Sequence, residues 1–415
     1  MNLRPYQSRL ADARLSALLH AFPAVLINGP RATGKTTTAM QHAKDVVQLD
    51  RPADAVAFAA DPDAALKLRQ EPLLLDEWQE VPGVLGAVRR AVDLDPRPGR
   101  FVLTGSVRAE LGTTLWPGTG RLITMQMYGL TEAEILGHVG SERRLFLDRV
   151  QEGDATLFPF LADRPTLPKY IGMAVRGGFP EVAITGLEVD SAHAWLESYL
   201  HGLITKDLRL DVRRNTGRMR AYFEALALNT AGIPQATTLA KAVGINIRTV
   251  ESYDDLFESV FVTEKVRAWS NNRLTRLTRT PKRYVVDSGL AAAAAGLTAA
   301  TILSDGDLLG RMLDTFVAAQ LRPEVALNSR FRAHHLRTKE GREEVDLIVE
   351  VGGGRLIAIE TKATAAPSAS DVRHLSWLRD IVGDRFVVGV VLHTGPAAFR
   401  LGDRLLALPI STIWD

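Results

Sequence analysis

The sequence predicts an α/β chain of two or three domains, on three observations. Its 415 residues exceed the ~250 at which a single hydrophobic core stops growing. Near the N-terminus, a short apolar run leads into a glycine-rich loop and a helix-compatible segment, the order found in parallel α/β sheets. Near the C-terminus, alternating apolar and polar residues flank three consecutive glycines, which predicts a β-hairpin.

The composition excludes several classes of site. Lys and Arg total 50 against 48 acidic residues, so any surface for nucleic acid must be local. Because the chain has no cysteine, it has no disulfide, thiolate zinc site, cysteine-ligated iron–sulfur cluster or cysteine nucleophile. Charged residues such as Arg9 and Asp12 argue against a secretory signal, and the uncharged stretch Gly289–Ser304 is short for a membrane span. We therefore expect a cytoplasmic protein with no membrane attachment.

The glycine-rich loop has the spacing of a nucleotide-binding loop. Ala24–Asn28 (AVLIN) predicts a buried strand, and the GPRATGKT that follows fits G-x-x-x-x-G-K-[ST]. In such a loop, backbone N–H groups bind phosphate oxygens, Lys35 reaches the β and γ phosphates and the Thr36 hydroxyl ligates Mg²⁺. We therefore expect ATP and Mg²⁺ as cofactors. The expected ATP-binding residues are Gly29, Pro30, Arg31, Ala32, Thr33, Gly34, Lys35, Thr36 and Thr37.

Later segments supply the other groups that ATP hydrolysis needs. Leu73–Leu75 predicts a buried strand that ends in two acids, Asp76 toward Mg²⁺ and Glu77 toward the attacking water. Phe101–Thr104 predicts another buried strand, from which Thr104 would sense the γ-phosphate unless it is an ordinary strand-end threonine. Arg121, on a loop, is a candidate arginine finger for a neighbouring subunit's γ-phosphate, with a merely solvated side chain as the alternative.

The middle of the chain has the spacing of a helix-turn-helix module. Residues 237–253 predict a short helix, a turn at Gly244 and a second helix. Residues 265–283 then hold seven basic residues and no acidic one, a local positive surface hidden by the near-zero net charge. The residues expected to contact DNA are Arg248, Thr249, Tyr253, Arg273, Arg276, Arg279, Lys282 and Arg283. A structural or protein-binding module is the alternative, because acidic residues such as Glu251 share the second helix and would repel phosphate.

The C-terminal hairpin carries a set of charged residues that suits metal-dependent chemistry. Asp346 lies on its first strand, while Glu360 and Lys362 are two residues apart on its second and therefore share a face. Asp314 lies on a preceding amphipathic helix. These four residue types make a metal-dependent phosphodiesterase chemically possible. A nucleic-acid-binding or structural domain without catalysis is the alternative.

These motifs in this order resemble the AAA-type ATPase core. More narrowly, they resemble a group of bacterial and archaeal ATP-binding proteins with a C-terminal domain of unknown function. The matching stretches are INGPRATGKTT, LLLDEWQEVP, FVLTGS, GGFPE, YLHGLITKDL, KRYVVDSGLA, EVDLIVE and AIETKA. The segment MYGLTEAEI departs from the LPLSFREF-like segment that this group would have there. The acid and E-x-K hairpin is similar to the restriction-endonuclease-like core, in which Asp and Glu bind Mg²⁺ and Lys helps activate water.

The resemblance implies three domains: a P-loop AAA-type ATPase over residues 1–168, a helical and winged-helix domain over 169–300, and a restriction-endonuclease-like α/β domain over 301–415. It also implies a homo-oligomeric ring, for instance a hexamer. The leading hypothesis is a Mg²⁺-dependent ATPase that binds and remodels DNA, including branched DNA. One alternative is an ATP-regulated, metal-dependent DNA nuclease. The other is a nucleotide switch that binds a protein partner in a toxin–antitoxin or stress system.

Overall fold

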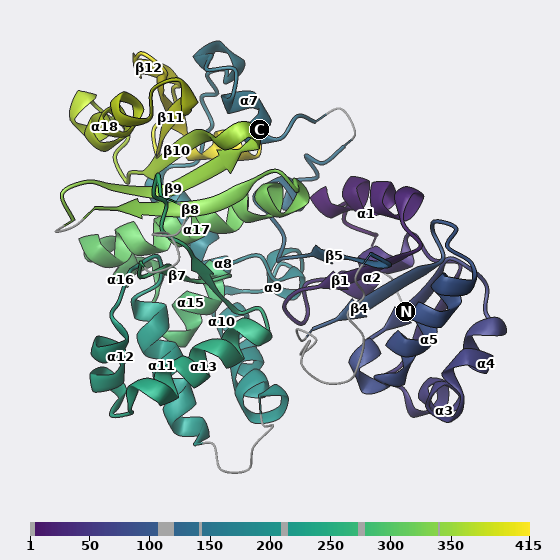
Figure 1. Cartoon of the computed structure of the whole chain (residues 1–415). Coiled ribbons are helices and arrows are strands. Elements are labelled where there is room, and N and C mark those ends of the chain that lie inside the picture. The colour runs from purple at the N-terminus through teal and green to yellow at the C-terminus, as the bar shows by residue number, and fades with distance from the viewer. Residues whose placement is uncertain (1–4, 107–119, 141–142, 209–214, 273–278, 339–340) are drawn as a thin grey trace. The chain divides into compact units, whose positions relative to one another are not determined.

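The computed structural model describes residues 5–106, 120–140, 143–208, 215–272, 279–338 and 341–415. The chain packs into two compact units, whose elements can be followed in Figure 1. The first comprises residues 1–130 with 139–141 and 259–261. The second comprises residues 131–138, 142–258 and 262–415. A compact unit can hold more than one domain, so the three-domain division remains a prediction.

The first unit is built on a five-stranded sheet in which every described strand pair is parallel. The order is β2-β3-β4-β1-β5. The strands are β1 (Ala24–Asn28), β2 (Asp45–Gln48), β3 (Leu73–Asp76), β4 (Phe101–Gly105) and β5 (Leu122–Gln126). Continuous apolar runs suit strands covered on both faces, and β3 and β4 are buried throughout. The predicted strands of this unit are confirmed.

Helices pack against this sheet, and the predicted ATP site lies at the carboxyl ends of its strands. They are α1 (Leu10–Ala21), α2 (Lys35–Met40), α3 (Pro52–Ala60), α4 (Pro62–Lys67) and α5 (Gly83–Leu94). Residues of α3, α4 and α5 share one apolar core with the strands, and Figure 1 shows α1 on the opposite side of the sheet. In a parallel sheet all carboxyl ends lie at one edge, which is where ligands of such folds bind. The predicted ATP-site residues after β1, β3 and β4 therefore meet there.

The second unit begins with a helical region. Its helices are α6 (Glu132–Ile135), α7 (Phe146–Val150), α8 (Leu167–Arg176), α9 (Pro180–Ala183), α10 (Val189–Gly202), α11 (Thr216–Leu228), α12 (Ala236–Val243), α13 (Ile247–Ser259), α15 (Ser288–Ala294) and α16 (Ala299–Ser304). Every residue of α15 is buried, because its small side chains allow α8, α10 and α11 to approach closely. A Cβ on Gly289 would lie 2.7 Å from the carbonyl oxygen of Arg176. No described helix combines the length and apolar character needed to cross a membrane.

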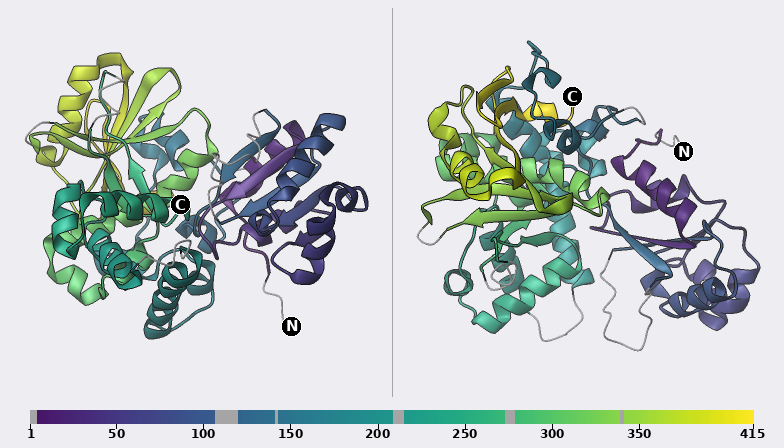
Figure 2. Two further views of the ribbon diagram at one scale, coloured as in Figure 1. Left: turned by 60° about the horizontal axis from the view of Figure 1, so that its bottom comes forward. Right: turned by 45° about the horizontal axis from the view of Figure 1, so that its top comes forward.

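The second unit ends in a six-stranded mixed sheet of order β12-β13-β11-β10-β9-β8. The strands are β8 (Arg332–Arg337), β9 (Glu344–Val351), β10 (Arg355–Thr361), β11 (Phe386–His393), β12 (Phe399–Gly402) and β13 (Leu405–Pro409). The antiparallel pair β9 and β10 confirms the predicted hairpin. Two helices, α17 (Gly306–Leu327) and α18 (Arg373–Val382), lie on either side of this sheet (Figures 1 and 2).

A two-stranded antiparallel sheet packs within this unit. It consists of β6 (Thr263–Val266) and β7 (Lys282–Val285), with Val266 opposite Lys282. All four residues of β7 are buried. The strand that we expected to be part of an exposed basic hairpin is therefore interior.

Candidate functional site

The glycine loop after β1 has a backbone that requires glycine at both ends. Gly29 has φ +148°, and a Cβ there would lie 2.0 Å from the carbonyl oxygen of Met127. Gly34 is left-handed at φ 87° and immediately precedes α2. Neither position admits a side chain without strain, as the nucleotide-loop pattern predicts.

Lys35, the first residue of α2, is buried inside this loop. Its ammonium donates hydrogen bonds to the carbonyl oxygens of Gly29 (3.1 Å) and Pro30 (2.7 Å). Burial lowers the pKa of Lys35 to about 8, against the opposing effect of the Glu77 and Asp76 carboxylates. The hydrogen bonds of a cation become stronger when an anion such as a phosphate replaces neutral carbonyl groups as the acceptor.

Three predicted side chains meet at the carboxyl edge of the sheet. The Thr36 hydroxyl donates to Oδ1 of Asp76 at 2.6 Å, and the Thr104 hydroxyl donates to the same oxygen. Mg²⁺ is bound by carboxylate and other oxygen ligands, usually with substrate phosphates. A threonine hydroxyl in contact with a buried carboxylate, beside a phosphate-sized loop, therefore fits Mg²⁺ with ATP. The γ-phosphate contact of Thr104 remains a prediction.

Glu77 follows Asp76 in an unusual backbone conformation. Its φ of 51° is left-handed, a conformation that costs a non-glycine residue about 1–3 kcal/mol. The Gln79 amide and the Ser106 hydroxyl (3.3 Å) both donate to its carboxylate. Arg31 in turn donates to the Ser106 hydroxyl at 3.2 Å. The strained residue is thus held within a polar network at the same edge of the sheet.

Gln79 and Ser106 were not among the predicted site residues. Neither belongs to a nucleotide-loop motif. Gln79 reaches Glu77 from two residues further along the same turn, whereas Ser106 reaches it because β3 and β4 are neighbours in the sheet. Ser106 could have been suspected, since it directly follows the predicted strand that carries Thr104. Gln79 lies within the LLLDEWQEVP stretch, but no role was predicted for it.

Arg121 lies near the amino ends of the parallel strands, whereas the predicted ATP-site residues lie at their carboxyl ends. It precedes β5, whose first residue, Leu122, is opposite Ala24, the first residue of β1. Its guanidinium pairs with Asp93 of α5. The phosphate loop follows the far end of β1, so Arg121 does not reach the phosphate loop of its own chain. Action on a neighbouring subunit remains a prediction.

In the second unit, the predicted metal ligands divide into two groups. Asp314 of α17 and Asp346 of β9 both bind the buried ammonium of Lys282, at 2.5 Å and 3.2 Å. Burial alone would lower the pKa of Lys282, but these two carboxylates raise it well above its usual value. The second group is Glu360 of β10 with Lys362, 3.1 Å apart. Burial raises the pKa of Glu360 to about 7.

This arrangement does not fit a divalent cation. Among the described residues, no three His, Cys, Asp or Glu side chains are placed to hold one metal ion. Lys282 takes the space between Asp314 and Asp346, and Lys362 takes one oxygen of Glu360. Lys282 was predicted as a DNA contact and not as a member of this cluster, because the basic residues near it in the sequence suggested one exposed surface.

Three of the predicted DNA contacts are wrong, because their side chains are buried. Tyr253 packs its ring 5.7 Å from that of Tyr222 and does not face outward on α13. Arg283 binds Asp254 at 2.8 Å and the Tyr222 hydroxyl at 3.0 Å. Lys282 points to the other side of β7, as alternation along a strand requires. For Lys282 and Arg283 the cause is that β7 is an interior strand, and for Tyr253 it is that its side of α13 packs against Tyr222.

The remaining predicted DNA contacts stay predictions. Arg273 and Arg276 lie outside the described residues. Arg279 donates to the carbonyl oxygen of Arg337 at 3.4 Å, and Thr249 donates to Asn246, both by its backbone N–H at 2.8 Å and by its hydroxyl at 3.0 Å. Arg248 is exposed at the start of α13.

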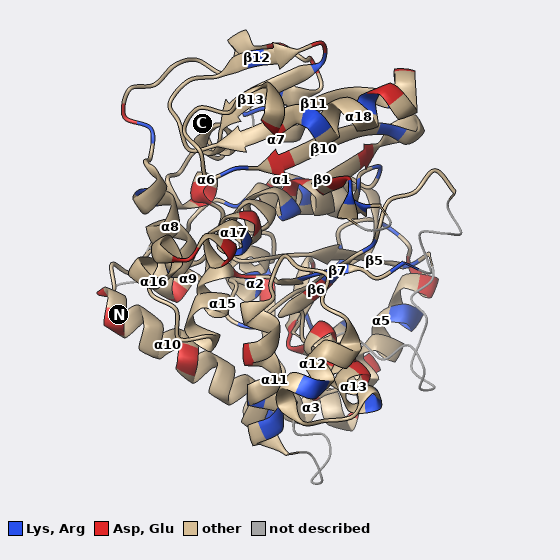
Figure 3. Ribbon diagram, turned by 90° about the vertical axis from the view of Figure 1, so that its left-hand side faces the viewer, with Lys and Arg blue, Asp and Glu red and all other residues tan. Residues whose placement is uncertain are grey.

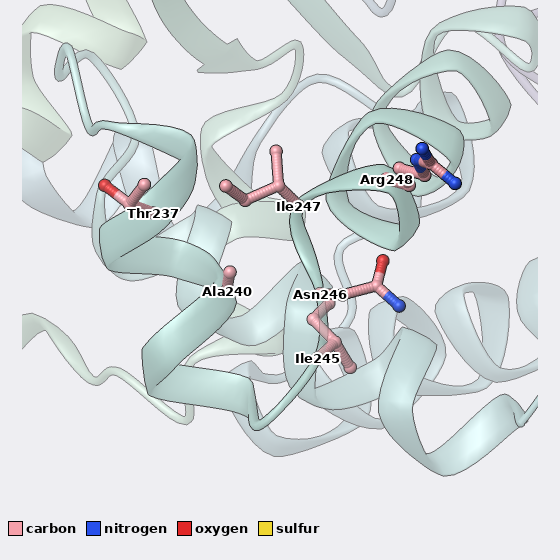
Figure 4. A pocket seen from close by; sticks show the side chains of 6 residues that line it. All are labelled: Thr237, Ala240, Ile245, Asn246, Ile247 and Arg248. Atoms are coloured by element: carbon pink, nitrogen blue, oxygen red, sulfur yellow. The ribbon is translucent and has the colours of Figure 1, made fainter.

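The predicted helix, turn and helix are confirmed as α12, a left-handed Gly244 and α13. A pocket lies at this turn, and Figure 4 shows Arg248 among its six lining side chains. In Figure 3, acidic and basic segments alternate around α12 and α13. Lys265, in the basic stretch, is 2.6 Å from Glu258 of α13. The charge pattern of the two helices is thus mixed rather than uniformly basic.

The match to a family model supports an ATPase assignment for the first unit. An AAA domain model matches residues 21–136. Two domains of unknown function, DUF8612 and DUF4143, match residues 167–301 and 309–413. The Walker-type ATPase PABY2304 of Pyrococcus abyssi is similar in structure with a TM-score of 0.42 and 13% identity, over 71% of this chain and 99% of that chain.

Two mycobacterial proteins match almost the whole chain. They are "Uncharacterized protein Rv2008c" of Mycobacterium tuberculosis and "Uncharacterized protein Mb2031c" of Mycobacterium bovis. Each is 30% identical over 413 residues, which is 98% of this chain and 84% of the relative. Because the match covers most of each relative, the chain belongs to the family that includes these two mycobacterial proteins, and residues 21–136 form its AAA domain.

Proposed function

We propose that this chain is a Mg²⁺-dependent ATP hydrolase that works at the carboxyl edge of its parallel sheet. The observation that carries the proposal is the 2.6 Å contact between Thr36 and Asp76, beside a loop whose backbone admits only glycine at Gly29. The buried ammonium of Lys35, the neighbour of Thr36 in the chain, supports the interpretation of this contact as part of a nucleotide–metal site. The match of the AAA domain to residues 21–136 supports the same activity.

Binding of ATP would change the partners of Lys35 and Thr36. Lys35 would leave the carbonyl oxygens of Gly29 and Pro30 for the phosphates, replacing neutral acceptors by charged ones. Thr36 and Asp76 would hold Mg²⁺, which neutralises the charge that develops on the phosphate oxygens. Thr104, already bonded to Asp76, would fix the position of that carboxylate.

Glu77 is the residue that we propose to orient the attacking water. Its carboxylate is occupied by Gln79 and Ser106, so it must give up at least one of these donors before it accepts a hydrogen bond from water. The Ser106–Arg31 contact joins this network to the phosphate loop. If Arg31 bound a phosphate, its contact with Ser106 would change, and with it the hydrogen bond from Ser106 to Glu77.

We also propose that the chain assembles into a homo-oligomer in which Arg121 serves a neighbouring subunit. The support is its position at the edge of the sheet away from its own phosphate loop. Its present partner, Asp93, is exposed, and an exposed ion pair is exchanged at little free-energy cost. An arginine provided in trans is a known way to stabilise the charge of phosphoryl transfer.

The geometry of the second unit does not favour DNA remodelling or DNA cleavage as the process that ATP hydrolysis would drive. The burial of Tyr253, Lys282 and Arg283 removes three of the DNA contacts that we expected. For the fold, the helix, turn, helix and two-stranded sheet support a winged-helix-like module, and the mixed sheet with α17 and α18 supports an endonuclease-like domain.

Phosphate release from ATP by the purified full-length chain tests the proposal. We expect hydrolysis in Mg²⁺ and none in EDTA. Lys35→Ala should reduce hydrolysis to background and weaken ATP binding, whereas Lys44→Ala, which changes an exposed lysine of the same unit, should alter neither. Hydrolysis at the wild-type rate by Lys35→Ala would refute the proposal.

A further inference from the structure

The buried ammonium of Lys282 has the oxygen environment of a metal ion. Oδ2 of Asp314 is 2.5 Å away, and Oδ1 and the carbonyl oxygen of Asp346 are 3.2 and 3.3 Å away. Two carboxylates and a backbone carbonyl are ligands that Mg²⁺ and Ca²⁺ use in proteins. Here all three oxygens accept a hydrogen bond from one lysine, which uses all three of its N–H donors.

The remaining carboxylate oxygens of this pair are also bonded. The Tyr284 hydroxyl donates to Oδ1 of Asp314 at 3.2 Å. The backbone N–H of Thr361 donates to Oδ2 of Asp346 at 3.1 Å. All four oxygens of the two side chains therefore have a donor from the chain itself, and a metal ion would have to displace at least one of them.

The negative charge of the E-x-K glutamate is likewise balanced by a lysine of the chain. Lys362 is 3.1 Å from Oε2 of Glu360, and the other oxygen, Oε1, is buried with no hydrogen-bond partner among the described residues. Two ammonium groups thus face three carboxylates. A divalent ion added to this set would leave an excess of buried positive charge, which is costly without further anions.

Lys282 is fixed in place from both sides of β7. Its backbone pairs with Val266 of β6. The next residue, Arg283, points to the opposite side and is bound to Asp254 and Tyr222. Only 2% of the Lys282 side chain is exposed, so the ammonium is shielded from solvent.

We infer that Lys282 is a built-in cation that takes the place of a divalent metal between Asp314 and Asp346, and so closes this cluster to metal. The cluster is then a structural joint between β7, α17 and β9, and not a phosphodiesterase centre. The inference concerns the second unit alone and does not depend on ATP hydrolysis.

Removal of the lysine should open the site. In the nucleotide-free full-length chain with Asp76→Asn, which disables the ATP-associated site, Mn²⁺ is titrated and counted by electron paramagnetic resonance. We expect the additional change Lys282→Met to create one Mn²⁺ site, with a Kd lower by about tenfold or more than any binding by the parent. Mn²⁺ should also raise the melting temperature of that variant and leave the parent's unchanged. Lys241→Met, at an exposed lysine of α12, should behave as the parent.

A second substitution assigns the new site. Lys282→Met with Asp346→Asn should lose the gained Mn²⁺ binding. If Lys282→Met is unfolded without metal because its carboxylates are unpaired, recovery of the fold on adding Mn²⁺ supports the inference. The inference is overturned if folded Lys282→Met binds Mn²⁺ no better than the parent. It is also overturned if Lys282→Met stays unfolded in Mn²⁺ while Lys282→Met with Asp314→Asn folds, or if the parent itself binds Mn²⁺ in a manner that Asp346→Asn abolishes.

Discussion

The hydroxyl of Thr36 donates to the buried carboxylate of Asp76 at 2.6 Å, which joins the phosphate loop to the end of β3. This contact determines how the site should respond to Mg²⁺. Replacing Asp76 by Asn keeps the shape of the side chain and removes its charge. We expect the Mg²⁺ concentration for half-maximal hydrolysis to rise by about 10- to 100-fold, the usual cost of losing a group that supports a bound metal.

The measurement is the ATPase rate over a range of Mg²⁺ concentrations at saturating ATP. Asp50→Asn, at an exposed acid of the same unit, should leave the midpoint unchanged. An Asp76→Asn midpoint equal to that of the wild type would count against the assigned role of this carboxylate.

Proton uptake should accompany ATP binding in alkaline solution. Burial lowers the pKa of Lys35 in the folded, ATP-free protein to about 8. Between about pH 8 and the usual lysine pKa, Lys35 is therefore mainly deprotonated in the folded protein but protonated in the unfolded chain. The free protein therefore gains stability from this group as the pH rises from about 8 toward the usual lysine value. Phosphates favour the charged lysine, so ATP binding at about pH 8.5 should take up about three quarters of a proton, with much less uptake at pH 7.

Calorimetric titration with ATP in buffers of different ionisation enthalpy measures this uptake. Lys35→Arg, which stays charged throughout, is the matched control and should bind ATP without uptake. Equal uptake by the two proteins would show that another group provides it.

Arg121 should act in trans. Arg121→Ala alone should lower the ATPase rate, because each site loses the arginine of its neighbour. Lys35→Ala loses its own nucleotide site but keeps Arg121. Mixing the two inactive proteins should therefore restore part of the activity, measured as the rate against the mixing ratio. If Arg121→Ala is fully active, Arg121 serves only its surface ion pair with Asp93.

Arg283 should stabilise the fold. Its guanidinium is 2.8 Å from Asp254, so Arg283→Ala leaves a buried carboxylate with the neutral Tyr222 hydroxyl, at 2.5 Å, and with Lys265 as its nearest remaining cation, at 3.7 Å. We expect the free energy of unfolding to fall by about 3 kcal/mol. Arg248→Ala, at an exposed arginine, should change it by less than about 0.5 kcal/mol. Chemical denaturation of both variants is the measurement, and equal stabilities would show that the Arg283 pair contributes nothing.

The ATP site could be predicted from sequence because it depends on local patterns. The glycine loop, the strand before Asp76 and the strand before Thr104 are each set within a few residues, and a parallel sheet brings their ends together. Ser106 escaped prediction because its contact with Glu77 depends on which strands are neighbours, and Gln79 because its contact depends on the conformation of the turn after β3.

The second unit was harder to predict because its charged residues pair over long distances in sequence. Lys282 and Arg283 are adjacent in a basic stretch, and that stretch was interpreted as a surface. Their partners, Asp314 and Asp254, come from separate helices, 32 and 29 residues away. Composition along the chain does not reveal such pairing, so buried ion pairs were mistaken for phosphate contacts.

The most direct test of the central claim is phosphate release by Glu77→Gln, measured together with ATP binding by the same preparation in Mg²⁺. The substitution keeps the size of the side chain and removes the carboxylate that would orient the attacking water. The account predicts that ATP still binds with near wild-type affinity while the hydrolysis rate falls by about 10²- to 10⁴-fold. A Glu77→Gln protein that hydrolyses ATP at the wild-type rate would contradict it.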